Sequence, residues 1–509
     1  MPAVTAGRLE GSRLLIANRG EIALRVVRTC RTLGVTSIAA HSEADAGMPF
    51  VREADEAVLL GPAPARESYL AVGRVVEAAR NARADAVHPG YGFLSENPDL
   101  PESLEEAGIG FVGPRAETIR LLGNKVKAKE AAAKAGVPVN RGTGNLKDPA
   151  EAAEEAARIG YPVLLKAAAG GGGRGMRIVE GPGEMEERFR TAAAEAEAAF
   201  GRRDLFLERL VRPARHVEVQ VFGDGKGEVA ALGERECSVQ RRHQKVIEES
   251  PSAAVDPALR KSLCGAAVAL AAAAKYRGAG TVEFLLAPDG RFHFLEMNCR
   301  LQVEHPVTEM TAGVDLVAAQ LRLALAGEMP AFPAPGPRGW AVECRVCAED
   351  PALGFAPSTG RILALEVPDG AFVRWDGGYG AGDVVGPHYD SLLGKLVCWG
   401  ATRGEAIARA REALGALAVL GPRTNGEFLR AVLDHPRFLE GRLSTDFLDE
   451  EFPMPWRGGE AAGGETAALA AAAWLLLQGN GGRAGAGAGQ TTGPWSSLPG
   501  WRQGGGAGA

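Results

Sequence analysis

The chain has 509 residues, of which 46% are apolar, and its formal net charge is −6. This length predicts two to four domains rather than one, and the charge argues against nucleic acid as a partner. Seven scattered cysteines, with no secretory signal ahead of the first predicted strand, indicate reduced thiols. The longest apolar runs, such as residues 265–274, are too short to span a bilayer. We therefore expect a cytoplasmic protein with no membrane segment.

The chain opens with the pattern of an open, nucleotide-binding type of sheet. Residues 13–17 predict a short strand, and the helix that follows has Ile22, Val26 and Cys30 on one face. Residues 36–40 predict a second strand. A strand, a helix and a strand in this order are typical of a Rossmann-like sheet. The turn after the first strand has a single glycine, so a nicotinamide cofactor is not supported.

A glycine-rich stretch lies between two predicted strands of a second unit. Residues 160–166 predict a strand that ends in Lys166, residues 167–175 are rich in glycine, and residues 176–179 predict the next strand. The glycines match G-x-G-x-x-G, but a strand follows them instead of the helix of a dinucleotide site. Such a loop can cover phosphates with its N–H groups and open as a lid. A plain surface hairpin is the alternative, and Lys166 argues against it.

A basic segment follows three further predicted strands, at residues 205–208, 215–222 and 230–237. Residues 240–245 contain two arginines, a histidine and a lysine. A basic run is usually a solvated face. Because this one lies between strands and just before an acidic region, it would suit an anionic ligand.

Residues 281–306 carry the most informative pattern. Two apolar runs, 282–286 and 292–295, flank a turn sequence and predict a β-hairpin. Polar side chains then fall on every second residue, and an extended chain would place on one face Glu296, Asn298, Arg300, Gln302 and Glu304. A two-residue turn would set Glu283 opposite Phe294, one diagonal step from Glu296.

The side chains of Glu283, Glu296 and Asn298 would then converge. Carboxylate and amide oxygens suit a hard divalent cation, and Mg²⁺ usually takes one or two carboxylates plus substrate phosphates. The alternative is the solvated face of an edge hairpin. The alternation fits that alternative, but it does not explain why ligand oxygens, an arginine and a carboxylate follow one another.

A third unit begins after the proline-rich segment 330–337. It has predicted strands at residues 340–346 and 372–375 and an amphipathic helix at residues 405–417. From Gly458 onward alanine, glycine and polar residues dominate, which indicates a linker or an incomplete, poorly ordered domain. The expected divisions are residues 8–121, 122–336 with a lid at about 139–207, 337–449 and 450–509.

The order of strand, glycine loop, strand, Glu208 and acidic hairpin resembles the ATP-grasp ligases. A closer resemblance, to the biotin carboxylases, rests on motifs at residues 18–23, 88–92, 240–245, 300–306 and 343–345, and it covers about residues 12–448. The departures are small. Cys299 stands where the family often has threonine, Cys347 where asparagine is common, and Ala169 shortens the glycine run by one. These could alter the mobility of the lid, but none removes a charged site residue.

The resemblance implies a fold of the α/β and α+β classes. It comprises a Rossmann-like pre-ATP-grasp domain, an ATP-grasp domain with a glycine-rich lid and a C-terminal biotin carboxylase domain. The implied activity is that of a ligase in which ATP phosphorylates bicarbonate to carboxyphosphate and the carboxyl group passes to N1 of biotin. This is the first half-reaction of a biotin-dependent acyl-CoA carboxylase. The resemblance also implies Mg²⁺ or Mn²⁺, about two ions with ATP, and biotin as a carrier-borne substrate.

Roles for the charged residues follow from the resemblance and agree with their chemistry. Bicarbonate must be deprotonated, and Glu304 would be the base. The anion would be held by Arg300 and Lys245, with the backbone near Gln302 and Val303.

Biotin and the nucleotide would use other side chains of the same region. Arg345 would stabilise the oxyanion of biotin, and the three oxygen ligands of the hairpin would hold the metal. The residues implied for ATP are Lys125, Lys166, Gly170, Gly171, Gly172, Gly173, Met176, Glu208, Arg209, Val211, His216, Gln240, His243, Glu283 and Glu296.

Two other functions stay open at this point. A different ATP-grasp ligase, such as a carbamoyl-phosphate or amino-acid ligase, should lack the 300–304 set or Arg345. A non-catalytic assembly subunit should have lost a charged site residue, and none is lost. Taken singly, His216 and His243 could be ordinary strand histidines, Arg345 a salt-bridge residue and Lys125 a surface lysine.

The expected partners are a biotin carboxyl carrier protein and a carboxyltransferase subunit, in a homodimer or a larger complex. A carrier domain typically presents its lysine in a Met-Lys-Met context, and no Met-Lys dipeptide occurs here. We therefore expect biotin to be supplied in trans. Residues 493–495 and 500–502 resemble the start of the middle domain in α subunits of 3-methylcrotonyl-CoA-type carboxylases. The chain is expected to be such a subunit cut short, or a separate subunit with a relic tail.

Overall fold

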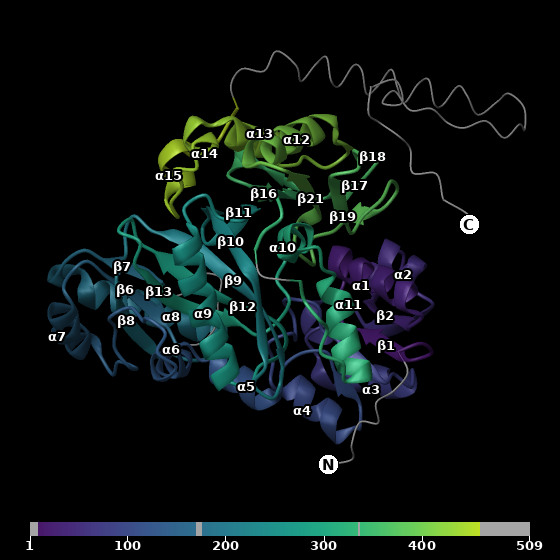
Figure 1. The fold of residues 1–509 in the computed structure, drawn as a ribbon, viewed down its shortest axis with the longest axis horizontal. Coiled ribbons are helices and arrows are strands. Elements are labelled where there is room, and N and C mark those ends of the chain that lie inside the picture. The colour runs from purple at the N-terminus through teal and green to yellow at the C-terminus, as the bar shows by residue number, and fades with distance from the viewer. Residues whose placement is uncertain (1–8, 169–175, 334–335, 459–509) are drawn as a thin grey trace, which may run out of the picture.

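The computed structural model describes residues 9–168, 176–333 and 336–458. Its first unit is a parallel sheet with the strand order β3-β2-β1-β4-β5, at the right of Figure 1. The strands are β1 (Arg13–Ile16), β2 (Thr36–Ser42), β3 (Glu56–Gly61), β4 (Ala86–His88) and β5 (Gly110–Phe111). The helices of this region are α1 (Gly20–Leu33), α2 (Pro49–Glu53), α3 (Val72–Asn81), α4 (Asp99–Glu106) and α5 (Ala116–Leu122). The Rossmann-like prediction is confirmed.

α1 forms because its apolar residues recur at helical spacing. Ile22, Val26 and Cys30 are buried together on one side of the helix. The helix ends where Gly34 takes a left-handed φ of 68°, a conformation that glycine adopts without steric cost. Glu21 in its first turn lies 3.0 Å from the ammonium of Lys395 in the third unit. α1 therefore fastens the first unit to the third.

The lid region is a small antiparallel sheet with the order β7-β6-β8, at the far left of Figure 1. It consists of β6 (Val163–Ala167), β7 (Arg177–Val179) and β8 (Leu205–Arg209), and it follows α6 (Lys125–Lys134). Helices α7 (Pro149–Ile159) and α8 (Met185–Phe200) pack on it around a core of their own. The two expected strands are present on either side of residues 169–175. The predicted lid residues Gly170, Gly171, Gly172 and Gly173 lie outside the described residues.

An eight-stranded sheet runs through the second and third units, with the order β13-β12-β9-β10-β11-β14-β21-β19. Its strands are β9 (Arg215–Asp224), β10 (Val229–Arg241), β11 (Gln244–Ser250), β12 (Arg277–Leu286), β13 (Phe292–Asn298), β14 (Trp340–Cys347), β19 (Val373–Gly377) and β21 (Leu392–Gly400). β11 pairs with β14, so the two units share one continuous sheet. Side chains that are far apart in the sequence therefore meet on one of its faces.

Helices of the second and third units lie around this sheet, and the third unit forms the top of Figure 1. They are α9 (Pro257–Ala273), α10 (His305–Ala312), α11 (Leu316–Leu321), α12 (Arg403–Ala416), α13 (Gly426–Asp434), α14 (Pro436–Leu439) and α15 (Phe447–Glu451). The short strands are β15 (Glu349–Asp350), β16 (Ala356–Pro357), β17 (Gly360–Arg361), β18 (Ala364–Glu366), β20 (Val384–Val385) and β22 (Ala418–Leu420). Within the described residues, we find no helix with the length and apolar character needed to cross a membrane.

Two expectations for the acidic hairpin were wrong. Glu283 pairs directly with Glu296 rather than with Phe294, because a β-bulge shifts the register between Glu283 and Phe284. The strand also ends at Asn298, so the five alternating polar residues do not share one extended face. Glu304 instead occupies the N-cap position of α10. The polar groups still meet, through a loop and a helix start rather than through a single strand.

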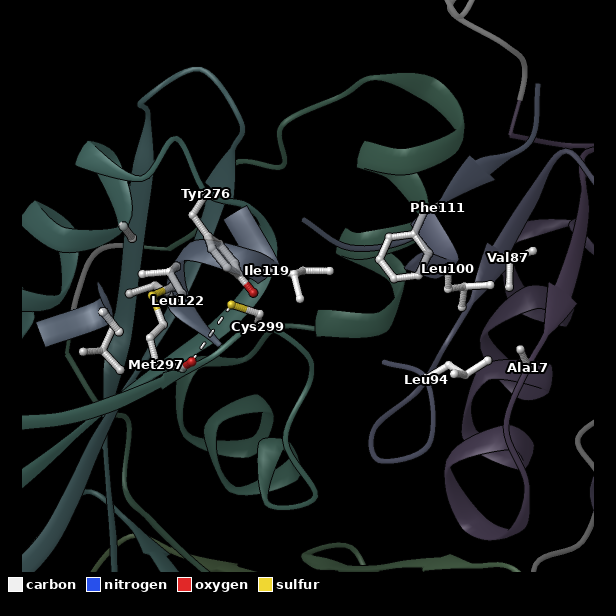
Figure 2. Packing of buried hydrophobic residues seen from close by; sticks show 14 of the residues in the cluster. Ala17, Val87, Leu94, Leu100, Phe111, Ile119, Leu122, Tyr276, Met297 and Cys299 are labelled. Carbon is white, nitrogen blue, oxygen red and sulfur yellow. Dashed lines mark hydrogen bonds between the residues drawn. The ribbon is translucent and has the colours of Figure 1, made fainter. Parts of the chain in front are cut away.

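A shared hydrophobic core joins the first unit to the back of this hairpin. Figure 2 shows Val87, Leu100 and Phe111 on the side of the parallel sheet, and Tyr276 and Cys299 on the side of the hairpin. All five side chains are buried. The loop that follows β13 is thus anchored from behind by apolar packing.

Candidate active site

Lys245 lies at the centre of the acidic region. It stands at the start of β11, and its ammonium donates to Glu304 at 2.6 Å, to Glu283 at 3.1 Å and to Glu218 at 2.5 Å. The carboxyl of Glu304 is fully buried. Three buried carboxylates around one ammonium form a compact charged cluster. Clusters of this kind are typical of functional sites that bind charged substrates.

The charges of this cluster shift the pKa of Glu304. Burial alone would raise it, but Lys245 and Arg345 outweigh burial and hold it well below the ordinary value. The pKa of Lys245 is in turn raised well above its ordinary value: burial would lower it, but the surrounding carboxylates, Glu218 first, prevail. Glu304 is therefore an anion and Lys245 a cation in this state.

Arg345 reaches the same cluster from the neighbouring strand β14. Its Nε donates to Glu248 at 2.6 Å and its Nη2 donates to Glu304 at 2.8 Å. The carboxyl of Glu248 is buried, and burial raises its pKa to about 7 in spite of the arginine. Arg345 thus contacts both the predicted base, Glu304, and the buried carboxyl group of Glu248.

The predicted metal ligands are adjacent, and their two carboxylates are paired with basic side chains. Glu296 lies 2.7 Å from the ammonium of Lys125, and Glu283 lies 3.1 Å from Nε2 of His216. Asn298 donates to Glu283 at 2.8 Å. Two carboxylates and an amide on paired strands are an oxygen donor set that suits a hard divalent cation.

Arg300 is held on all sides by hydrogen-bond acceptors. Its Nη1 donates to Gln302 at 2.9 Å, its Nη2 to Asn298 at 3.2 Å and its Nε to Glu96 at 2.9 Å. The carbonyl of Val303, next to the predicted base, accepts from Lys395 at 2.9 Å. Among the residues expected to bind bicarbonate, Arg300 contacts Gln302 directly. Gln302 and Lys245 both donate to Oε1 of Glu283.

A pocket of about 540 Å³ lies beside this cluster, within the usual range for a small-molecule site. Apolar side chains of the lid and the hairpin form part of its wall: Leu164, Ile178, Leu285 and Leu295. It is lined by every predicted nucleotide residue that the structure describes: Lys125, Lys166, Met176, Glu208, Arg209, Val211, His216, Gln240, His243, Glu283 and Glu296. Helix α15 of the third unit contributes Asp449 to the rim.

Glu208 is paired with two lysines at the wall of this pocket. Its carboxylate lies 2.6 Å from Lys129 and 3.2 Å from Lys166. Burial would raise the pKa of Glu208, but the two lysines lower it to about 2. Burial also lowers the pKa of Lys166 in spite of Glu208. The pocket wall therefore carries the ion pair of Lys166 with Glu208.

The basic run divides between the pocket and the opposite side of the sheet. Gln240 and Lys245 are paired across the β10–β11 hairpin and both face the site. Arg242 and His243 form its two-residue turn, with φ of 49° and 64°. Arg241 stacks on Phe355 at 4.1 Å instead. Gln240, Arg242 and His243 line the pocket, whereas Arg241 does not.

Sequence reasoning missed several partners of the site residues. They are Glu96, Lys129, Glu218, Arg235, Glu248 and Lys395. Glu218 and Arg235 lie on predicted strands, where a buried charge is unusual and gives a signal. The others act through contacts between separate elements, which no local pattern reveals.

The lid sheet and the acidic hairpin, facing each other across a nucleotide-sized pocket, define the ATP-grasp class of ligases. Family models described as the N-terminal domain of biotin carboxylase, the ATP-binding domain of the carbamoyl-phosphate synthase L chain and the C-terminal domain of biotin carboxylase match residues 10–119, 124–331 and 343–450. A biotin carboxylase of Nostoc is 47% identical over 445 residues, which is 86% of this chain and 98% of the relative. The chain belongs to the biotin carboxylase family.

Solved structures agree with this membership. A Campylobacter jejuni biotin carboxylase with a β,γ-ATP ligand is 43% identical, with a TM-score of 0.84 over 87% of this chain and 99% of that one. The biotin carboxylase domain dimer of Hydrogenobacter thermophilus 2-oxoglutarate carboxylase, with MgADP, ADP and bicarbonate, is 42% identical, with a TM-score of 0.85 over 88% and 99%. The predicted family and fold class are confirmed, and a different ATP-grasp ligase is not favoured.

Proposed function

We propose that this chain catalyses the ATP-dependent carboxylation of biotin with bicarbonate. One observation carries the proposal: Lys245 joins the predicted base Glu304, at 2.6 Å, to the predicted metal ligand Glu283, at 3.1 Å. A single cation thereby links the position for bicarbonate to the position for the phosphates of ATP. The two substrates would meet at this ammonium.

The first step would be the activation of bicarbonate. Its oxygens would take the guanidinium of Arg300 and the ammonium of Lys245, together with the Gln302–Val303 segment. A bound anion would compete with Glu304 for Lys245, and the pKa of the carboxylate would rise towards that of a useful base. Glu304 would then accept the proton of bicarbonate. The freed oxygen attacks the γ-phosphorus of ATP, the bond to ADP breaks, and carboxyphosphate forms.

The residues on β12 and β13 fit a divalent metal ion that accompanies ATP. Glu283, Glu296 and Asn298 would hold Mg²⁺ or Mn²⁺, about two ions in the full complex, in place of their present cationic partners. Such an ion neutralises the charge that develops on the phosphates. Lys125, Lys166 and His216 would supply further positive charge along the pocket. The predicted nucleotide contacts of the glycine loop fall on residues 170–173, which lie outside the described residues.

Biotin would react in the second step. Carboxyphosphate releases its carboxyl group to N1 of biotin, and the N1 proton passes to the departing phosphate. The negative charge that develops on the ureido oxygen would face the guanidinium of Arg345. Arg345 can turn from Glu304 to biotin once the proton has neutralised that carboxyl, while Glu248 keeps hold of its Nε.

The wider assembly is part of the proposal. Biotin would arrive on a biotin carboxyl carrier protein, and a carboxyltransferase subunit would use the product, with this chain in a homodimer or a larger complex. The Hydrogenobacter domain, similar at 42% identity, forms a dimer, and light scattering on the purified chain tests the same state here. The unit boundaries at 8–121, 122–336, 337–449 and 450–509 are also proposed.

Bicarbonate-dependent hydrolysis of ATP tests the function. The purified chain with MgATP should release phosphate only when bicarbonate is present, and free biotin should increase the rate. Carboxybiotin should appear when labelled bicarbonate is used. Phosphate release that ignores both bicarbonate and biotin would contradict the proposal.

A further inference from the structure

We propose that Glu96, in the first unit, is a positioning residue that aims the guanidinium of Arg300 at bicarbonate. The proposal rests on the function proposed above and adds a residue to it. Glu96 touches neither the metal ligands nor the pocket wall among the described residues. It would therefore act through the side chain of Arg300 and the backbone next to it.

The carboxylate of Glu96 makes two hydrogen bonds to consecutive residues. Its Oε1 accepts from the backbone N–H of Cys299 at 3.0 Å. Its Oε2 accepts from Nε of Arg300 at 2.9 Å. One carboxylate thus fixes both the backbone and the side chain at the point where β13 ends. A flexible arginine held by two such bonds has few orientations left.

Both ends of this contact are rigidly supported. Leu94 and Ser95, immediately before Glu96, are buried at 3% and 1% exposure. Cys299 lies in the hydrophobic core with Tyr276 and Met297 (Figure 2). The two segments are 203 residues apart in the sequence. The contact therefore transmits the position of the first unit to the anion site of the second.

The edge of the guanidinium that Glu96 occupies decides where an anion can bind. Arginine offers an anion either its Nε edge or the fork between its two terminal nitrogens. Glu96 takes the Nε edge, so the fork remains for bicarbonate. The fork nitrogens now contact Gln302 and Asn298. Bicarbonate and the metal would compete for these two contacts when they bind, whereas the bond to Glu96 can persist.

A surface ion pair with only a structural role is the alternative. Glu96 has 38% of its side chain exposed, and exposed pairs contribute little to stability. This exposure makes the test clean, because substitution of Glu96 should leave the fold intact. An effect confined to bicarbonate would then report on the position of Arg300.

The test measures steady-state ATP hydrolysis with bicarbonate and ATP varied separately. For Glu96→Ala we expect KM for bicarbonate to rise by about tenfold, the lower end of the effect of removing a supporting residue. KM for ATP and the melting temperature should stay within twofold and about one degree of the parent values. Glu96→Gln keeps an acceptor oxygen and should recover part of the loss. Glu106→Gln, an exposed acid in α4 of the same unit, is the matched control.

Two results would overturn the proposal. One is an unchanged KM for bicarbonate in Glu96→Ala, and the other is an equal rise in both Michaelis constants. A crystal structure of Glu96→Ala gives a readout that needs no activity: the guanidinium of Arg300 should leave its present orientation, and a retained orientation would refute positioning by Glu96. If the parent chain shows no bicarbonate-dependent hydrolysis, the proposed function fails, while this crystallographic test still decides the role of Glu96.

Discussion

The ammonium of Lys245 lies 2.6 Å from Oε1 of Glu304, and both groups are buried or nearly so. This contact keeps the predicted base ionised but also makes it weak, because Lys245 and Arg345 hold its pKa well below the ordinary value against the effect of burial. A bound bicarbonate would draw Lys245 away and strengthen the base. Glu304 would thereby become a stronger base only when bicarbonate is bound.

Glu304→Gln should abolish bicarbonate-dependent ATP hydrolysis while ATP still binds. The amide cannot accept the proton, and loss of a general base costs roughly 10²–10⁴-fold in rate. Rates are measured by phosphate release and ATP binding by calorimetry. Turnover within threefold of the parent would remove Glu304 from the role of base.

Glu343→Gln is the matched control for that experiment. Glu343 is equally buried, and burial raises its pKa well above the ordinary value, whereas the pKa of Glu304 is lowered. The amide keeps the size of the side chain, and burial already disfavours the charged form of Glu343, so the rate should stay within about threefold of the parent. A large loss in both variants would point to packing rather than to proton transfer.

Arg345→Ala should reduce biotin carboxylation more than ATP cleavage. The guanidinium is expected to act on the oxyanion of biotin, and one lost donor costs about 10²–10³-fold in comparable sites. Cleavage is followed by phosphate release without biotin, and carboxylation by fixation of labelled bicarbonate. Because Arg345 also contacts Glu304 at 2.8 Å, Arg345→Lys is the companion variant that retains a charge. Equal losses in both half-reactions would make the residue structural.

The stability of the protein should carry a pH signature of Glu248. Burial raises the pKa of this carboxyl to about 7, against an ordinary value of 4.5. The folded state thus binds its proton more tightly than the unfolded state does. This favourable contribution is complete below pH 4.5 and is lost as the pH rises through about 7.

Glu248→Gln should remove that dependence. Between pH 5.5 and 8 the free energy of unfolding of the parent should fall by about 2 kcal/mol relative to the variant, from the cited pKa values. Urea unfolding at both pH values measures it, and comparison of the two proteins cancels the other titrating groups. The amide oxygen can still accept from Nε of Arg345, so the contact itself survives. Parallel curves for the two proteins would mean that Glu248 does not titrate in this range.

The residues that line the proposed nucleotide pocket were largely predictable from the sequence, and the reason lies in local patterns. Lys166 at a strand end and Glu208 on the next strand each sit in a run whose period of two fixes the face. Where the chain leaves regular structure, this reasoning fails. The bulge after Glu283 and the helix start at Glu304 break the period, so the predicted shared face was wrong although the cluster of groups was right.

Contacts between units could not be predicted from the sequence, for a different reason. Glu96 meets Arg300 across 204 residues, and Lys395 meets Val303 across 92. Such pairs depend on how sheets and loops dock, and a single sequence carries no register for docking. These contacts nevertheless fix the two residues that flank the proposed bicarbonate position.

Metal dependence gives the last prediction. Lys125 lies 2.7 Å from Glu296, so a metal ion must displace the ammonium before this carboxylate can bind it. Glu296→Gln should raise the Mg²⁺ concentration for half-maximal ATP hydrolysis by at least about tenfold, since a lost ligand should cost no less than a lost supporting residue. Lys125→Met removes the competitor and should not raise that concentration, although KM for ATP should increase as a phosphate contact is lost. Titration of Mg²⁺ at saturating ATP separates the two. An unchanged Mg²⁺ requirement in Glu296→Gln would exclude Glu296 as a ligand and leave it only as the partner of Lys125.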